Sequence, residues 1–234
     1  TIAWAWVARG RGLAEAVDSS AWPVFFDRLR RAEEHLHTAA SMGPADPLPW
    51  VALLSSGLGT DPGEDAMQDR FVNAMERAPY LATAIHLRHL SLCAKWGGSR
   101  DQSFAFARWV VDNAPLATPV HDVLAIAHLE NALAEHRRRP EVSAESMFGF
   151  DHVRDDIRRA ADRSVASGGF GDSAVHVRCR NTFALTLLWI RDAPGSRAQF
   201  DAIGSRFGPE PWSLLGDPAE VAARTRAVAR ALSA

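Results

Sequence analysis

The chain of 234 residues is long enough to bury a large hydrophobic core, and its formal net charge of −2 is nearly balanced. This balance excludes a strongly basic surface, so neither nucleic acid nor an anionic membrane is expected as a partner. Lys95 is the only lysine among the 26 basic residues. The excess of arginine, together with abundant alanine, is typical of high-GC bacterial coding.

Both cysteines, Cys93 and Cys179, fall within apolar stretches and do not form a metal-type pair by their spacing. We expect buried, reduced thiols, which are typical of a cytoplasmic protein. The sequence has no signal-peptide pattern and no apolar run of about 20 residues that could span a membrane. A cytoplasmic location without a metal or other cofactor is therefore expected.

Apolar residues recur with the helical period along the chain, and no segment shows the alternation expected of a strand. Proline, glycine and N-capping residues divide this pattern into separate helices, with helix-start signals that include Asp61, Ser143 and Asp217. In chain order, the expected helices cover residues 2–17, 22–42, 50–58, 62–77, 81–96, 100–113, 119–138, 143–167, 173–191, a short segment after 194, and 217–233. We expect an all-α fold of about ten to twelve helices in antiparallel hairpins, forming one domain over residues 1–234 with a capping helix at 217–233.

Residues 78–115 read as two helices joined by a glycine turn and bracketed by two Ala-Pro stops. The two glycines at 97–98 are suited to end the first helix in a left-handed conformation, and Ser99 is suited to cap the second. The first helix is apolar around more than half of its circumference, as expected of a helix packed on several sides. His86 and His89 nevertheless fall inside that apolar arc.

Four other polar residues lie among or beside apolar neighbours on their helices, namely Glu130, Arg178, Asn181 and His176, and Glu33 falls close to the apolar face of its own helix. Burying a charge without a partner costs several kcal/mol, so such groups should find one another or face a cavity. Two interpretations remain open, a buried pair that fixes helix packing and a ligand pocket. A metal site has less support, because two histidines three residues apart lack a defined third ligand.

Other polar and aromatic side chains are expected at the surface. Arg88 lies in the narrow polar strip of its helix, and His121 and His128 share the more polar face of theirs. Trp96 and Trp212 stand beside glycine turns or prolines and are candidates for a stacking surface.

A repeat is visible around two prolines that each follow an alanine, Pro79 and Pro115, which are 36 residues apart. The segment RFVNAMERAP at 70–79 parallels FARWVVDNAP at 106–115. With Trp50 upstream, this pattern resembles tetratricopeptide-type repeats, whose period is about 34 residues. The resemblance covers residues 46–115 and implies a right-handed solenoid or a compact bundle of hairpins, with a concave surface that binds peptides or partner proteins.

The leading hypothesis is a helical-repeat binding or scaffold protein that recognises a partner polypeptide, or another copy of itself, through a groove beside residues 78–115. The alternative is a small-molecule binding protein or an enzyme with a pocket of buried polar residues. The candidate ligand-binding residues are His86, His89, Trp96, Glu130, Arg178 and Asn181. No residue pattern predicts a catalytic centre, so no catalytic residue is assigned.

Overall fold

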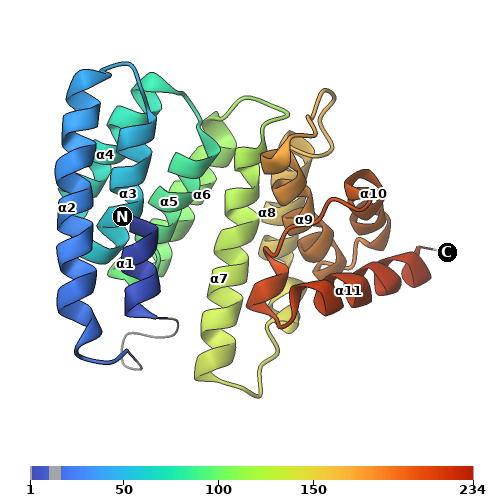
Figure 1. Cartoon of the computed structure of the whole chain (residues 1–234). Coiled ribbons are helices and arrows are strands. Elements are labelled where there is room, and N and C mark those ends of the chain that lie inside the picture. Colours follow the sequence, from blue (N-terminus) through green and yellow to red (C-terminus); the bar gives the residue numbers. More distant parts are fainter. Residues whose placement is uncertain (1, 11–16, 234) are drawn as a thin grey trace. The chain divides into compact units, whose positions relative to one another are not determined.

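The computed structural model describes residues 2–10 and 17–233, and all regular secondary structure in these ranges is helical (Figure 1). The predicted all-α fold is therefore confirmed. Contacts divide the chain into two compact units, Thr1–Gly98 and Ser99–Ala234. The single domain expected over the whole chain stays a prediction.

The first unit is built from α-helices that pack in chain order. They are α1 (Ile2–Arg9), α2 (Ala21–Met42), α3 (Leu48–Thr60), α4 (Glu64–Arg77) and α5 (Ala82–Ser91), followed by the 3-10 turn η2 (Ala94–Trp96). Helix α2 contacts both α1 and α3, and α5 contacts both α3 and α4 (Figure 1). The apolar faces close over a core that includes Phe25, Leu29, Leu53, Leu54 and Ile85, each at most 1% exposed.

Two helix boundaries in this unit differ from the predicted ones. Helix α1 ends at Arg9, before Gly10 with φ 82°. The rest of the helix expected over 2–17 includes residues 11–16, which lie outside the described residues. Helix α4 begins at Glu64 rather than at residue 62, because Asp61 adopts a left-handed conformation, with φ 48°, and ends α3.

The helix expected over 81–96 is shorter than predicted. It ends at Ser91, after which Leu92 and Cys93 lead into η2, whose last turn is closed by Gly97 with φ 90°. The predicted left-handed glycine is thus confirmed. Its neighbour Gly98 lies so close to the carbonyl group of Leu92 that a Cβ atom there would stand 2.2 Å from that oxygen.

The second unit contains the remaining helices. They are α6 (Arg100–Asn113), α7 (Asp122–Arg138), α8 (Asp151–Arg163), α9 (Ala174–Trp189), α10 (Ala193–Ile203) and α11 (Pro218–Leu232), with 3-10 turns η3 (Pro119–His121), η4 (Glu145–Gly149) and η5 (Trp212–Leu214). Helix α7 contacts α6, α8 and α9, while α10 packs along α9 and α11 contacts both (Figure 1). The two helices of the expected 78–115 hairpin, α5 and α6, therefore belong to different units.

The helix starts of this unit show which sequence signals were read correctly. The side chain of Ser99 accepts a hydrogen bond from the backbone N–H of Gln102, and Asp217 caps α11 in the same way, as predicted. The signal at Ser143 was read wrongly, since a turn and η4 come first and α8 begins only at Asp151.

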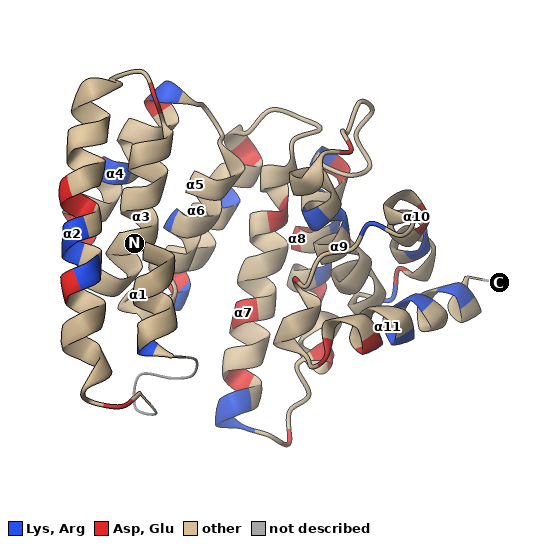
Figure 2. Cartoon of the chain, viewed as in Figure 1, with Lys and Arg blue, Asp and Glu red and all other residues tan. Residues whose placement is uncertain are grey.

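Charges of both signs are interspersed along the helices of each unit, including α2 and α11 (Figure 2). This agrees with the nearly balanced net charge of −2. Within the part of the chain that the structure describes, no helix has both the length and the apolar character needed to cross a membrane.

Candidate functional site

The six candidate ligand-binding residues are distributed over both units. His86, His89 and Trp96 belong to the first unit, and Glu130, Arg178 and Asn181 belong to the second. Each unit therefore has to be considered by itself.

The two histidines of the first unit differ in their surroundings. His86 is half-buried, and its Nδ1 lies 2.6 Å from the carbonyl oxygen of Ala82 one turn earlier on the same helix. His89 is 1% exposed, and its backbone carbonyl accepts a hydrogen bond from the thiol of Cys93. No group of three or more potential metal ligands occurs among the described residues, so the weak histidine pattern gains no support there.

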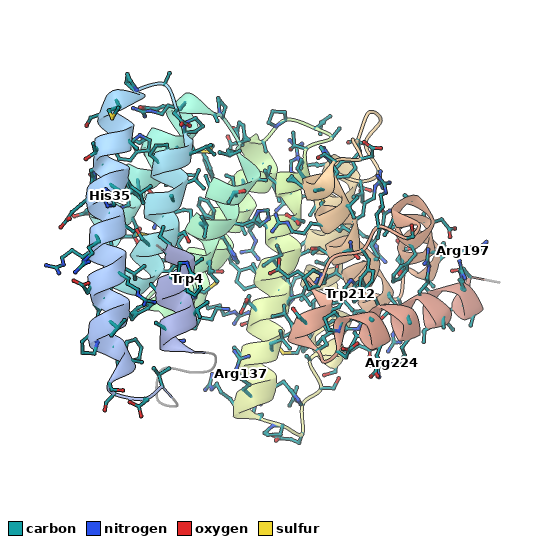
Figure 3. The ribbon with its side chains drawn as sticks, in the orientation of Figure 1. Trp4, His35, Arg137, Arg197, Trp212 and Arg224 are labelled. Carbon is teal, nitrogen blue, oxygen red and sulfur yellow. The ribbon has the colours of Figure 1, made fainter. Side chains whose placement is uncertain are left out.

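The two tryptophans expected at a stacking surface both pack against other aromatic rings. Trp96 is half-buried and packs edge-on against Trp6 of α1, with ring centroids 5.9 Å apart. Trp212 is completely buried in the second unit and stacks on Phe200 (Figure 3). Trp212 is therefore not accessible to a ligand, whereas Trp96 keeps part of its surface exposed.

The buried residue Asn181 has a structural role in α9. Its side-chain amide donates to the carbonyl oxygen of Val177 at 2.8 Å, and its Oδ1 accepts a hydrogen bond from Nε1 of Trp212 at 2.9 Å. Both ends of the amide are therefore satisfied within the unit. Asn181 is a packing residue, in agreement with the first of the two interpretations left open by the sequence.

The candidate residue Arg178 lines an open pocket of about 420 Å³, at the start of α9, which we call the Arg178 pocket. The full lining is Asp172, Ala174, Val177, Arg178, Arg206, Phe207, Gly208, Pro209 and Glu210. The first turn of α9 supplies one wall and the connection between α10 and η5 supplies the other. Glu130, half-buried on α7, is not part of this lining.

The charged groups of the Arg178 pocket are partly paired with one another. Arg206 donates to the backbone carbonyl of Asp172 at 3.1 Å and lies 3.6 Å from its carboxylate. Phe207, on the same wall, is 49% exposed. The pocket thus combines guanidinium groups, carboxylates and an accessible aromatic ring.

A second cavity of the same unit contains a residue that the sequence placed wrongly. His128 is only 4% exposed instead of lying at the surface, and His121 is completely buried. The cavity beside His128, of about 80 Å³, is lined by Arg100, His128, Asn131, Met147, Phe148, Phe150, His152 and Val153; we call it the His128 cavity.

His128 is held in place by a carboxylate behind it. Its Nε2 lies 3.1 Å from Oδ2 of Asp156 on α8, and Arg108 of α6 donates to the same oxygen at 3.0 Å. Phe104 packs edge-on against the imidazole, with centroids 4.7 Å apart. Burial lowers the pKa of His128, and the hydrogen bond to Asp156 offsets this only in part.

The pKa of the Asp156 carboxyl group is shifted in the direction that favours the charged form. Burial raises its pKa, but hydrogen bonds from His128 and Arg108 outweigh that effect, and the net pKa lies below its usual value. At neutral pH the pair is therefore a neutral imidazole that donates from Nε2 to a carboxylate.

In the first unit, Glu33 and Arg70 form a buried ion pair. Arg70, 7% exposed, donates to both carboxylate oxygens of Glu33 at 2.9 and 3.1 Å. The hydroxyl groups of Ser56 and Thr60 also donate to Glu33, at 2.7 and 3.0 Å. This group of side chains joins α2, α3 and α4, and Glu33 and Thr60 also line an open pocket of about 450 Å³.

Arg88 is part of a similar arrangement, which corrects its expected place in an exposed strip. It is 3% exposed, donates to the carboxylate of Glu64, and reaches Oε1 of Gln68 at 3.0 Å. A long side chain on α5 is thus used to pair with residues near the start of α4.

No protein-family model matches the chain, and no curated protein or solved structure was found to be similar to it. The resemblance to tetratricopeptide-type repeats therefore stays a prediction. The geometry of the two pockets in the second unit carries the functional argument.

Proposed function

We propose that the protein is a non-enzymatic, tetratricopeptide-like binding protein of the bacterial cytoplasm that recognises a partner polypeptide through the Arg178 pocket. The observation that carries this proposal is the pocket itself, with a volume of about 420 Å³. Ligand pockets of proteins commonly enclose about 300–1,000 Å³. The pocket therefore has room for one or two side chains of a polypeptide.

The apolar part of the lining favours a ligand that continues beyond the pocket. Val177 and Pro209 lie in the lining, and Phe207, 49% exposed, also presents its ring to solvent. An accessible aromatic ring beside a pocket is a common anchor in protein recognition. A polypeptide can place one apolar side chain in the pocket and cover Phe207 with the next.

The charged part of the lining indicates which polypeptides fit. Arg178 and Arg206 place two guanidinium groups in the lining, and Arg206 uses part of its donors for the backbone carbonyls of Asp172 and Ala202. Asp172 and Glu210 line the same pocket and would repel a ligand with several negative charges, such as a nucleotide. The matching ligand is a segment with one acidic side chain next to an apolar one.

The test begins with selection of peptides from a displayed library on the purified full chain. Binding of the selected peptide is then measured by fluorescence polarisation. Arg178→Glu and Phe207→Ser should each weaken binding by at least about tenfold, which corresponds to about 1.4 kcal/mol. Phe207 is exposed, so its replacement should leave folding intact.

Matched controls are available on α11 of the same unit. Arg224 is an exposed arginine (Figure 3), and Val228 is an apolar side chain that is 41% exposed. Arg224→Glu and Val228→Ser should change peptide affinity by less than about twofold. Selection of no peptide, or equal weakening by the pocket variants and the controls, would overturn the proposal.

A further inference from the structure

The His128 cavity is lined by hydrogen-bond donors and by no carboxylate among the described residues. Arg100, Asn131 and His152 contribute a guanidinium, an amide and an imidazole, and Phe148 and Val153 form apolar walls. This lining differs from that of the Arg178 pocket, in which carboxylates and guanidinium groups occur together. Its donor set matches the acceptor oxygens of an anion.

The buried imidazole of His128 is also part of the cavity lining. His128 is 4% exposed and uses Nε2 to contact Asp156. Since Nε2 is engaged with Asp156, Nδ1 is the ring nitrogen through which His128 would meet a ligand.

The aromatic surroundings define the two ends of the cavity. Phe148 is completely buried and lies beside His128, with ring centroids 6.4 Å apart, at the inner end. Phe150, 57% exposed, stacks on His152 at 5.9 Å at the outer end. A ligand would therefore enter past His152 and stop at His128.

We infer that the His128 cavity binds a small oxyanion, a carboxylate or a tetrahedral phosphate-type group, between Arg100, His152 and the imidazole of His128. The volume of about 80 Å³ admits such a group but excludes a drug-sized ligand. The positive end of the α8 dipole lies at the same place, and the exposed carboxylate of Asp151 in the first turn offsets part of it.

Binding of the anion is coupled to a proton on His128. Without a ligand, burial and the positive charge of Arg108 hold the imidazole neutral, while Asp156 favours its charged form and His152 opposes it. When an anion enters, a proton on Nδ1 turns this nitrogen from an acceptor into a donor. The imidazolium of His128 then lies between two negative charges, the bound anion and the carboxylate of Asp156. Anion affinity should therefore rise as the pH falls from 8 to 6.

Sodium sulfate and sodium acetate are suitable probes, because neither anion changes its charge appreciably between pH 6 and 8. Isothermal titration calorimetry on the full chain should show one saturable site for at least one of them. Binding of sulfate alone would assign the site to phosphate-type groups, and binding of acetate alone to carboxylates. Absence of saturable binding of either anion would overturn the inference.

The variants use residues at the open end of the cavity, because replacement of buried His128 risks unfolding. Arg100→Gln and His152→Gln should each weaken anion binding by at least about tenfold. Arg224→Gln, which removes an exposed arginine from α11, should leave it unchanged. Equal weakening in all three variants would show that the anion binds by general charge attraction, and would refute the site.

A spectroscopic readout separates ligand contact from structural damage. In protein labelled with ¹⁵N-histidine, saturating anion should shift the His128 ring nitrogens toward the doubly protonated form at pH 7. An unchanged His128 spectrum at saturation would also overturn the inference. Neither measurement depends on the Arg178 pocket, so the polypeptide proposal can fail or succeed separately.

Discussion

Replacing Glu33 by glutamine removes the charge from a carboxylate that is nearly enclosed by its donors. Glutamine retains one oxygen that can accept hydrogen bonds, but its NH2 group cannot accept from Arg70 and it carries no negative charge. Arg70 donates to both Glu33 oxygens and is only 7% exposed, so the variant leaves a buried positive charge without a counter-charge. We expect Glu33→Gln to destabilise the first unit.

The expected loss is about 3 kcal/mol in the free energy of unfolding. Removal of one partner from a buried ion pair costs about 3–5 kcal/mol, and the lower end applies because the Glu33 side chain is 18% exposed. Arg70→Met should cost a similar amount, since it leaves the carboxylate of Glu33 without its cation. The double variant has no buried charge left, and should lose about 3 kcal/mol rather than the sum of about 6.

Equilibrium urea unfolding of the wild type, the two single variants and the double variant at pH 7 measures the coupling between Glu33 and Arg70. It is followed by circular dichroism and by hydrogen exchange within residues 1–98. Hydrogen exchange is included because two compact units need not unfold together. Additive losses, with a coupling below about 0.5 kcal/mol, would refute the assignment of Glu33 and Arg70 as a stabilising pair.

The same pair predicts a dependence on pH with a definite sign. Burial raises the pKa of Glu33, but hydrogen bonds from Arg70, Ser56 and Thr60 outweigh it, so the net pKa in the folded protein is lowered. The stabilisation is therefore complete above the ordinary glutamate pKa of about 4.3, and is lost as the pH falls through the lower folded value. The stability difference between wild type and Glu33→Gln should shrink in that range.

Two further substitutions test features of the backbone and the core. Gly98→Ala should destabilise the chain by about 2 kcal/mol or more, because its Cβ would stand 2.2 Å from the carbonyl oxygen of Leu92. As a control, Gly149→Ala should change the urea midpoint little, because the space around Gly149 is open. Asn181→Leu should cost about 2 kcal/mol by leaving the indole N–H of Trp212 buried and unpaired, and a midpoint equal to that of wild type would contradict this role.

Helices were predictable because their period and capping residues are local properties of the sequence. The side chains of Ser99 and Asp217 cap helices where the sequence placed them. Asp61 also carried a start signal, but its backbone turned left-handed and ended α3 instead. In a short connection, a capping residue can end the preceding helix or begin the following one, and tertiary packing decides which of the two occurs.

The site was less predictable, because the burial of a polar side chain depends on partners that are remote in sequence. His128 read as exposed on a polar face, yet Asp156, 28 positions later, receives its hydrogen bond in the interior. Arg88 was misplaced for the same reason, since Glu64 and Gln68 lie on another helix. Histidine and carboxylate residues among apolar neighbours indicated that polar groups would be buried. They did not indicate which residues would contact one another.

The contact between Asn181 and Trp212 has a consequence for the Arg178 pocket. One wall of that pocket belongs to α9, and the other is the connection over 204–211 that leads to Trp212. The indole, completely buried and bonded to Asn181, anchors the end of this connection to the same helix that carries Arg178. This wall of the pocket is therefore ordered before a ligand binds, so binding does not carry the entropic cost of ordering it. Asn181→Leu removes this anchor and should weaken peptide binding, although Asn181 itself does not line the pocket.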